Sequence, residues 1–501
     1  MRFHTSRYAA RPNFLCAPAA LALLAVAGGC ASLDPKPDID RAATTVRERS
    51  GFAPAWDQPW TGPLEAWDGA GPLAVDQAVV TALRNNRAIR AEVEEIATGR
   101  ADLVQAGLLP NPVLSLTLRF PFDPVSGGTF IGTQAVQTFT ALWLRPSRIR
   151  GADARLNAMV LGVSDKALRL VADVKAAHAR IAYGQRSAEI TRASIAAAGQ
   201  LAAKVEKQRD AGVTTQLAVN RVRQQVKTLD EELRRRHREL AKDRRRMLEL
   251  MGFAAASGDW TAFLSATEDE ATHEAAPPEP ITEDTVIALA THQRLDVAAT
   301  GALVAASAAD LSVEERNRLK DLGLGVDYER DVDGKRTIGP VLSVPIPIFD
   351  TNKAQIAKAG SLARAALARH EAVVQRAVRE ARVAYIGMTQ AAAAADDFRH
   401  DKLGGAADLP QRLAFNERGA EVSFQAGEIT LIDWLDVLRE RQSALQTLND
   451  LRLEAAISRI ELEYAVGGRL TPVLPATPPP LPAPSSAPST SHLPENHWGK
   501  R

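Results

Sequence analysis

Cysteine is scarce in this 501-residue chain, and both copies lie near its start. Because Cys16 and Cys30 occur so early, the rest of the chain can form neither disulfides nor cysteine metal sites. The formal net charge is only +1, which gives no electrostatic reason to expect a nucleic-acid partner. The sequence contains no intact glycine-rich phosphate loop, nucleophile elbow or zinc-binding His-Glu-x-x-His motif. These absences predict a protein that is not an enzyme and uses no cofactor or metal.

Proline is absent from Ser147 to Phe253, and aromatic residues make up only 5% of the chain. Hydrophobic residues still reach 46%, and alanine and arginine are abundant, which favours long helices. A single helix over 147–209 would be roughly 94 Å long at about 1.5 Å per residue. A second long helical segment is expected over 352–409, with an interruption at Gly404–Pro410.

The chain contains an internal repeat. Ala211–Thr215 recurs as Ala426–Thr430, and the same offset of 215 residues carries Gly252 onto Gly467. Each copy reads as a helix, two short strands, a very long helical segment, an Ala-Gly turn and another helix. A duplicated rod of this kind favours a conduit over a catalytic domain.

Two short strands are expected in each copy, because apolar and polar residues alternate there. The first pair covers 114–120 and about 134–144, and the second covers 322–329 and 338–348, joined by a turn at Asp333-Gly334. A membrane barrel needs about eight strands or more, so four strands cannot close one. Three copies would supply twelve. The alternative is a small soluble sheet that caps a helical bundle.

The N-terminus resembles an export signal. Three arginines precede an apolar stretch at 14–27, which is shorter than the roughly 20 residues of a spanning helix. We expect residues 1–29 to be a signal peptide and Cys30 to be lipidated, with cleavage after Ala27 as the alternative. No aspartate follows Cys30, which favours the outer membrane. Residues 30–72 are then expected to form a lipid-anchored, extended arm that lies on the body of the protein.

Composition divides the rest of the chain. We expect the first repeat at 73–265, an acidic, proline-bearing linker at 266–280 and the second repeat at 281–470. The tail at 471–501 is rich in proline and serine and is expected to be disordered.

Three segments together resemble the outer-membrane efflux proteins, the TolC-like outer membrane factors. They are Gly107–Pro112, Val344–Asp350 and Ala426–Asp436, and the resemblance covers about residues 73–470. It implies a mainly α fold with a small membrane β-barrel: a homotrimer whose twelve strands are continuous with a periplasmic helical barrel. It also implies three partners, namely a periplasmic adaptor protein, an inner-membrane resistance-nodulation-division pump and outer-membrane lipid.

The resemblance places the two Ala-Gly turns at the periplasmic tips, where the adaptor would bind. Small and apolar side chains there would suit docking of a helical hairpin. The residues expected at this contact are Gly212, Val213, Thr214, Gly427, Ile429, Thr430 and Leu431.

The same resemblance implies a pore gate at Asp433 and Asp436. These residues are three apart and share one helix face, so a trimer would place about six carboxylates around the entrance. Such a ring would attract cations, and mutual repulsion would make some of its acids easier to protonate. The alternative is a solvated helix face. An arginine lock known in some family members has no counterpart, because Ile429 and Ala218 stand at those positions.

We therefore predict a passive duct of a tripartite efflux system for drugs or heavy-metal cations. The stretch 347–353 favours the metal-efflux branch. The alternatives are an outer-membrane duct for type I protein secretion and a lipid-anchored periplasmic coiled-coil spacer that never spans the membrane.

Overall fold

A computed structural model of the chain describes residues 32–56, 71–120, 122, 128–253, 260–262, 281–318, 321–400 and 408–470. The expected signal peptide, Cys30, the linker at 266–280, the Gly404-Gly405 interruption and the tail after residue 470 lie outside these ranges. The described residues are mainly helical and include one four-stranded and one two-stranded sheet.

The two repeats have nearly the same order of elements. After the N-terminal helix α2 (Lys36–Ser50) come β1 (Gly71–Leu73), α3 (Val75–Asn85), α4 (Arg87–Gly107), β2 (Val113–Arg119), β3 (Phe130–Thr138), α5 (Thr140–Asp210), α6 (Gln216–Leu250) and β4 (Trp260–Ala262). The second repeat has α8 (Glu283–Gln293), α9 (Leu295–Arg316), β5 (Gly323–Arg330), β6 (Arg336–Ser343), α10 (Lys353–Arg399), α11 (Leu409–Ala426) and α12 (Leu431–Ala465). The pair α10 and α11 thus takes the place of the single helix α5.

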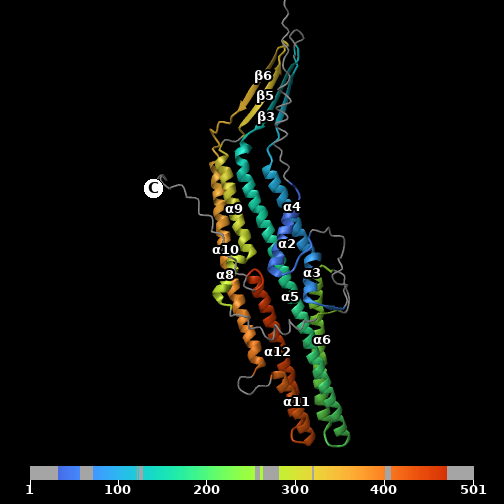
Figure 1. The fold of residues 1–501 in the computed structure, drawn as a ribbon. Coiled ribbons are helices and arrows are strands. Elements are labelled where there is room, and N and C mark those ends of the chain that lie inside the picture. The colour runs from blue at the N-terminus through green and yellow to red at the C-terminus, as the bar shows by residue number, and fades with distance from the viewer. Residues whose placement is uncertain are drawn as a thin grey trace, which may run out of the picture. The chain divides into compact units, whose positions relative to one another are not determined.

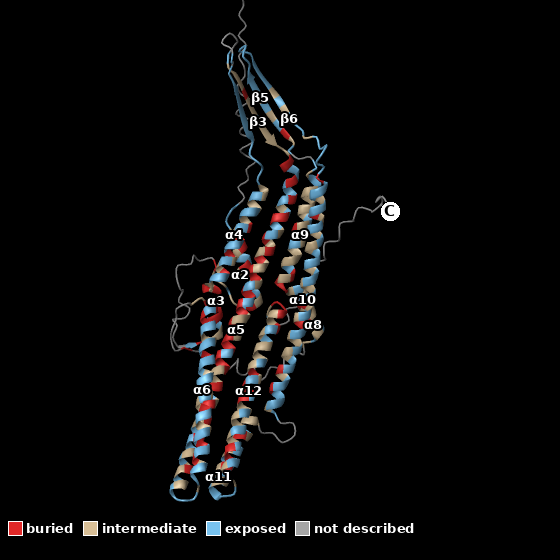
Figure 2. Cartoon of the chain, turned by 180° about the vertical axis from the view of Figure 1, so that it is seen from behind, coloured by how far each residue is buried: buried red, intermediate tan, exposed pale blue. Residues whose placement is uncertain are grey.

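The long helices have the strands at one end and the two hairpin turns at the other (Figure 1). Helix α5 contacts α2, α3, α4, α6, α9 and α12. Buried residues follow α5 along its length in Figure 2, and the largest core cluster joins it to α2, α3, α4 and α6. Among the described helices, α9 is long and apolar enough by composition to cross a membrane, yet it packs against α5 and α10.

The sheet of β2, β3, β5 and β6 is antiparallel, and its two faces differ in polarity. Directly opposed residues share a face, and the register pairs Leu114 with Ala135 and Leu324 with Leu342. One face, which we call the apolar sheet face, therefore carries Leu114, Leu116, Leu118, Leu324, Val326, Tyr328, Ile338 and Leu342, all exposed. The other, the polar sheet face, carries Ser115, Thr117, Gln134, Asp327, Glu329, Thr337 and Ser343. The separation is incomplete, because Val113, Val136 and Val341 lie on the polar sheet face and Arg330 and Arg336 lie at one end of the apolar sheet face.

Two strands end earlier than predicted. The second strand was expected over about 134–144, but β3 ends at Thr138 and Thr140 already belongs to α5. Pro146 lies inside α5 near its start, where a proline removes one backbone hydrogen bond without ending the helix. Strand β6 ends at Ser343 because Pro345 and Pro347 cannot donate hydrogen bonds to a strand ladder.

The N-terminal arm is not extended as predicted, because Lys36–Ser50 forms the helix α2. Pro37 occupies the first turn of this helix, where a missing N–H costs nothing. Ala42 and Val46 are fully buried in the main core, so α2 is part of the body. Pro35 and Pro37 therefore mark the start of a helix and not an extended segment.

Both repeats contain a helix break that the sequence did not reveal. The helix expected before the strands of the first copy divides at Asn86 into α3 and α4. The Asn86 side chain caps α4 and donates through Nδ2 to the Leu250 carbonyl at 2.9 Å. The second repeat divides at Arg294, which donates through Nη1 to the Ala465 carbonyl at 3.5 Å. Leu250 and Ala465 are 215 residues apart, so the two repeats use corresponding carbonyls.

Gly252→Ala is expected to destabilise the protein more than Gly212→Ala. Both glycines have positive φ, +78° and +73°, so both substitutions bring backbone strain of about 1–2 kcal/mol. A Cβ on Gly252 would also lie 2.5 Å from the Asn85 carbonyl oxygen, whereas Gly212 has open space. Urea unfolding of both variants measures the difference, and equal midpoints would contradict the close approach.

Candidate functional site at the helical tips

The two hairpin turns are built alike. Gly212 and Gly427 adopt left-handed conformations, φ +73° and +78°, and end α5 and α11. The Val213 N–H donates to the Gln208 carbonyl at 2.8 Å, and the Glu428 N–H donates to the Ser423 carbonyl at 2.9 Å. These corresponding hydrogen bonds close both helix ends in the same way. The repeated Ala-Gly motif therefore encodes the same turn twice, as its repetition suggests.

A threonine begins the helix after each turn. The Thr215 hydroxyl accepts from the Ala218 N–H, and the Thr430 hydroxyl accepts from the Asp433 N–H at 3.3 Å. In the second repeat Asp433 completes a capping box by accepting from the Thr430 N–H at 2.8 Å. Ala218 occupies the corresponding position of the first repeat, so only α12 has this second hydrogen bond.

Asp433 is exposed, and its hydrogen bonds to the Thr430 hydroxyl and N–H hold its pKa below the usual value. A lowered pKa is the opposite of the raised pKa expected for a ring of carboxylates in an assembly. In a single chain the carboxylates of the other subunits are absent, so the hydrogen bonds of the helix cap set the direction of the shift. Because this pKa is lowered, the ionised Asp433 carboxylate stabilises the helix cap at neutral pH. That stabilisation is lost as the pH falls through the folded-state pKa.

Asp436 is also exposed and lies one turn after Asp433. Its Oδ1 accepts from Arg439 at 3.1 Å, and the Arg439 Nε donates to the Gln225 side chain on α6 at 3.0 Å. Arg439 therefore ties the expected gate helix to the first hairpin. This arrangement differs from an arginine directly after the turn, which the sequence lacks.

The two hairpins meet in a small core near the tips. Trp434 lies at its centre, with its ring centroid 4.8 Å from Phe424, and Lys204 of α5 stands 5.3 Å above the Trp434 ring. Lys204 also pairs with Glu421 of α11. The buried members of this tip core are Leu201, Val205, Val219, Val222, Ala420, Trp434 and Leu435.

The expected docking residues fall into two groups. Gly212, Val213, Gly427 and Thr430 are exposed, and Val213 keeps 74% of its surface. Thr214, Ile429 and Leu431 are half-buried, and the two apolar residues of this group pack against the tip core. Ile429 and Leu431 therefore contribute to joining the hairpins within one chain.

Sequence reasoning missed a second contact between the hairpins. Gln446 of α12 donates to the Ser187 carbonyl of α5 at 2.9 Å, and Asn449 donates to the Tyr183 carbonyl at 3.0 Å. Both amides are buried. The three-residue spacing of two amides on one helix face was the available signal, but their partners lie more than 250 residues away.

A buried ionic cluster lies where four helical segments meet. Arg294, only 5% exposed, pairs with Asp296 at 2.8 Å and with Glu380 of α10 at 2.8 Å. Tyr464 of α12 has its ring 6.0 Å from the Arg294 guanidinium, and Asp165 of α5 interacts with the same group. We call these five residues the Arg294 cluster.

Burial raises the pKa of Asp165 to about 6, and the nearby Asp296 adds to the shift. The folded protein therefore holds this proton more tightly than the unfolded chain, whose carboxyl titrates near 3.8. The contribution of Asp165 to the free energy of unfolding is therefore largest at low pH. It is lost as the pH rises from about 4 through 6.

Asp165→Asn is expected to remove this pH dependence. The variant should be more stable than the wild type at about pH 7.5, and the gap should close near pH 4. Urea midpoints of both proteins across this range measure the effect. A gap that does not change with pH would contradict the assignment to Asp165.

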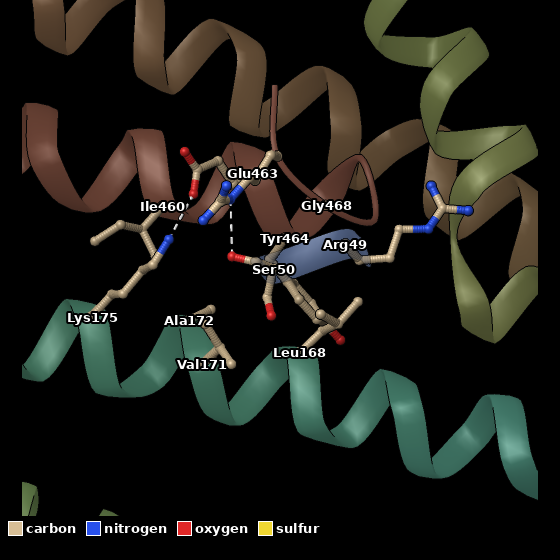
Figure 3. Close-up of a pocket in the computed structure, with 11 residues that line it drawn as sticks. Arg49, Ser50, Leu168, Val171, Ala172, Lys175, Ile460, Glu463, Tyr464 and Gly468 are labelled. Atoms are coloured by element: carbon tan, nitrogen blue, oxygen red, sulfur yellow. Dashed lines mark hydrogen bonds and ion pairs between the residues drawn. The ribbon is translucent and has the colours of Figure 1, made fainter. Parts of the chain in front are cut away.

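A pocket lies between α2, α5 and α12 (Figure 3). Lys175 pairs with Glu463 at 3.1 Å, and Arg469 Nε donates to the Ser50 carbonyl at 2.9 Å. The first pair joins α5 to α12, and the second bond joins the segment after α12 to the end of α2, so the pocket lies where these helices pack together. In the described ranges no group of three or more His, Cys, Asp or Glu residues is placed to hold a metal ion.

Long helical hairpins with a small exposed sheet at one end give this chain the fold of solved outer-membrane channel proteins, as the resemblance predicted. The chain is similar to the channel protein CusC, with 18% identity, a TM-score of 0.65 and coverage of 79% of this chain and 92% of CusC. It is also similar to the outer-membrane channel OprN, with 17% identity, a TM-score of 0.63 and coverage of 85% and 95%.

One curated relative is the cobalt-zinc-cadmium resistance protein CzcC of Cupriavidus metallidurans. It is 23% identical over 393 residues, which cover 75% of this chain and 86% of CzcC. No family model matches the chain. CusC and OprN are described as channels, and CzcC is described as a metal-resistance protein.

Proposed function

We propose that this chain is the outer-membrane channel of a tripartite efflux system and works as a homotrimer. The observation that carries the proposal is the exposed apolar sheet face on a sheet with two free edges, β2 and β6. An apolar face of this kind needs lipid or a partner, and inside lipid every strand edge must be paired. Three sheets joined edge to edge satisfy both requirements and give a twelve-stranded barrel.

The polar sheet face would then line the lumen. Asp327 and Glu329 lie on this face opposite glycines, Gly339 and Gly132, which leave room for water. The long helices would continue the duct through the periplasm, and the exposed tip residues would meet an adaptor. Solutes would pass without chemistry, with energy supplied by an inner-membrane pump.

Reconstitution of the purified full-length protein tests the proposal. We expect a trimer in detergent, heat-modifiable electrophoretic migration and ion conductance in planar bilayers. A monomer with no conductance would favour the lipid-anchored spacer instead. Because CzcC is named for cobalt, zinc and cadmium resistance, we infer that divalent metal cations are the cargo. Sensitivity of a deletion strain to these metals and to drugs tests that inference separately.

Asp433→Asn with Asp436→Asn is expected to weaken block of the channel by divalent cations. The proposed ring would lose its negative charge, while Thr430 could still cap α12. Conductance titrations with a divalent cation measure the change. Asp230→Asn with Asp243→Asn removes the same number of carboxylates from half-buried positions of α6 and serves as the control for charge loss. Unchanged block in the Asp433 and Asp436 variant would remove the gate assignment.

A further inference from the structure

Exposed apolar side chains continue beyond the sheet onto the first turns of the helices. Ile346, Ile348 and Phe349 follow β6 and expose 77%, 70% and 99% of their surfaces. Leu142 and Trp143, in the first turn of α5, expose 48% and 37%. We call these five residues the apolar belt. The belt follows β3 and β6 directly in the chain, and a group of exposed apolar residues of this kind suits contact with lipid or a partner.

The belt is at the level where sheet and helices join. The Phe139 N–H donates to the Leu322 carbonyl at 2.8 Å, which ties the start of α5 to the start of β5. The Ser147 and Ser312 hydroxyls lie 3.2 Å apart, and Asn352 Nδ2 donates to the Glu314 carbonyl at 2.8 Å. The start of α5, the end of α9 and the start of α10 therefore lie at one level.

Exposed cations follow the belt on the side away from the sheet. Arg148 of α5, Arg316 of α9 and Lys353 of α10 are exposed, and none has a carboxylate partner among the described residues. We call these three residues the basic collar. The acid Glu314 at the same level accepts from the Asn352 side chain at 2.9 Å but keeps its charge. Within 145–150, 314–318, 321 and 350–353, six lysines and arginines stand against four aspartates and glutamates, an excess of two positive charges. The collar thus keeps a local excess of positive charge.

The spacing between belt and collar fits a membrane surface. Arg148 follows Trp143 by five residues, or roughly 7–8 Å along a helix at about 1.5 Å per residue. The headgroup layer on each side of a bilayer is about 5–8 Å thick. Aromatic residues favour the boundary of the acyl region, and cations favour the phosphate level beyond it.

We propose that the basic collar binds the phosphates of anionic phospholipids in the periplasmic leaflet of the outer membrane. This inference rests on the proposed function, because it needs the sheet to lie in lipid. The apolar belt would sit at the edge of the acyl region, and the collar would fix the depth of the barrel. Lipid is favoured over a second protein because the belt continues a face that already needs an apolar solvent and the charge beyond it is cationic.

The test compares the full-length wild type with an Arg148→Gln, Arg316→Gln, Lys353→Gln variant. Both are partitioned between vesicles of phosphatidylcholine and vesicles that also contain phosphatidylglycerol. Three lost cations should reduce the preference for phosphatidylglycerol at least about tenfold. The control replaces Arg221, Lys242 and Arg245 by glutamine, which removes three exposed cations from α6. This control should keep the preference.

The outcomes separate the collar from the channel. If wild type and variant both conduct but share the same lipid preference, the proposal that the basic collar binds lipid is wrong, and the proposed channel function is unaffected. If the wild type forms no pore, the proposed function fails. A variant that no longer trimerises would place the collar at a subunit contact and overturn lipid binding. The single Lys353→Gln variant, with a smaller loss of preference, guards against misfolding. An equal loss in the α6 control would show non-specific charge attraction and also overturn the proposal.

Discussion

Leu116→Arg is expected to abolish stable insertion of this protein into membranes. Leu116 lies in the middle of β2 on the apolar sheet face and exposes 63% of its surface. An arginine facing lipid at the bilayer midplane costs about 2–4 kcal/mol, and a trimer would bear that cost in every subunit. The variant should lose heat-modifiable migration, accumulate outside the outer-membrane fraction and show no conductance.

Thr117→Arg is the matched control for this prediction. Thr117 is the next residue of the same strand but lies on the polar sheet face, opposite Gly132. An arginine there would extend into the proposed lumen, so the channel should still assemble, with altered conductance. If Leu116→Arg and Thr117→Arg behaved alike, the apolar sheet face would not face lipid.

Arg294→Met is expected to destabilise the helical body by about 2–4 kcal/mol. Removing this guanidinium leaves Asp296 and Glu380 without their main partner, and breaking a buried ion pair typically costs about 3–5 kcal/mol. We expect less than the typical cost for a buried pair because Glu380 is 40% exposed. Urea unfolding followed by circular dichroism at neutral pH measures the loss.

Two further variants test the origin of that loss. Arg246→Met removes an exposed pair with Glu249 and should change stability by less than about 0.5 kcal/mol. Glu380→Gln added to Arg294→Met should recover part of the loss, because the two residues are coupled. If Arg294→Met matched Arg246→Met, the cluster would be incidental to stability.

The strands and tip turns were predictable because their signals are local. Alternation from Leu114 to Leu118 identified β2, and the positive φ of Gly212 and Gly427 explains why glycine occurs in both turns. The break at Asn86 was not predictable in this way. Asparagine is tolerated within helices, and its role here depends on the Leu250 carbonyl, 164 residues away.

The candidate site also contains local contacts that the sequence predicts and long-range contacts that it does not. Thr430 and Asp433 form a local capping box whose spacing is readable in the sequence. The contact of Lys204 with Trp434 and Glu421 joins helices from different repeats, so no local pattern encodes it. The Arg294 cluster likewise draws on α5, α9, α10 and α12. Long-range pairing of this kind appears only once the helices are packed.

For the proposed trimer, the open sheet has a consequence for each subunit before assembly. Before it meets other copies, one chain exposes the unpaired edges of β2 and β6 next to the apolar sheet face. Such edges template the addition of foreign strands, and intermediates of this type aggregate as their concentration rises. Yield of the proposed trimer should therefore fall when subunits are produced faster than they assemble.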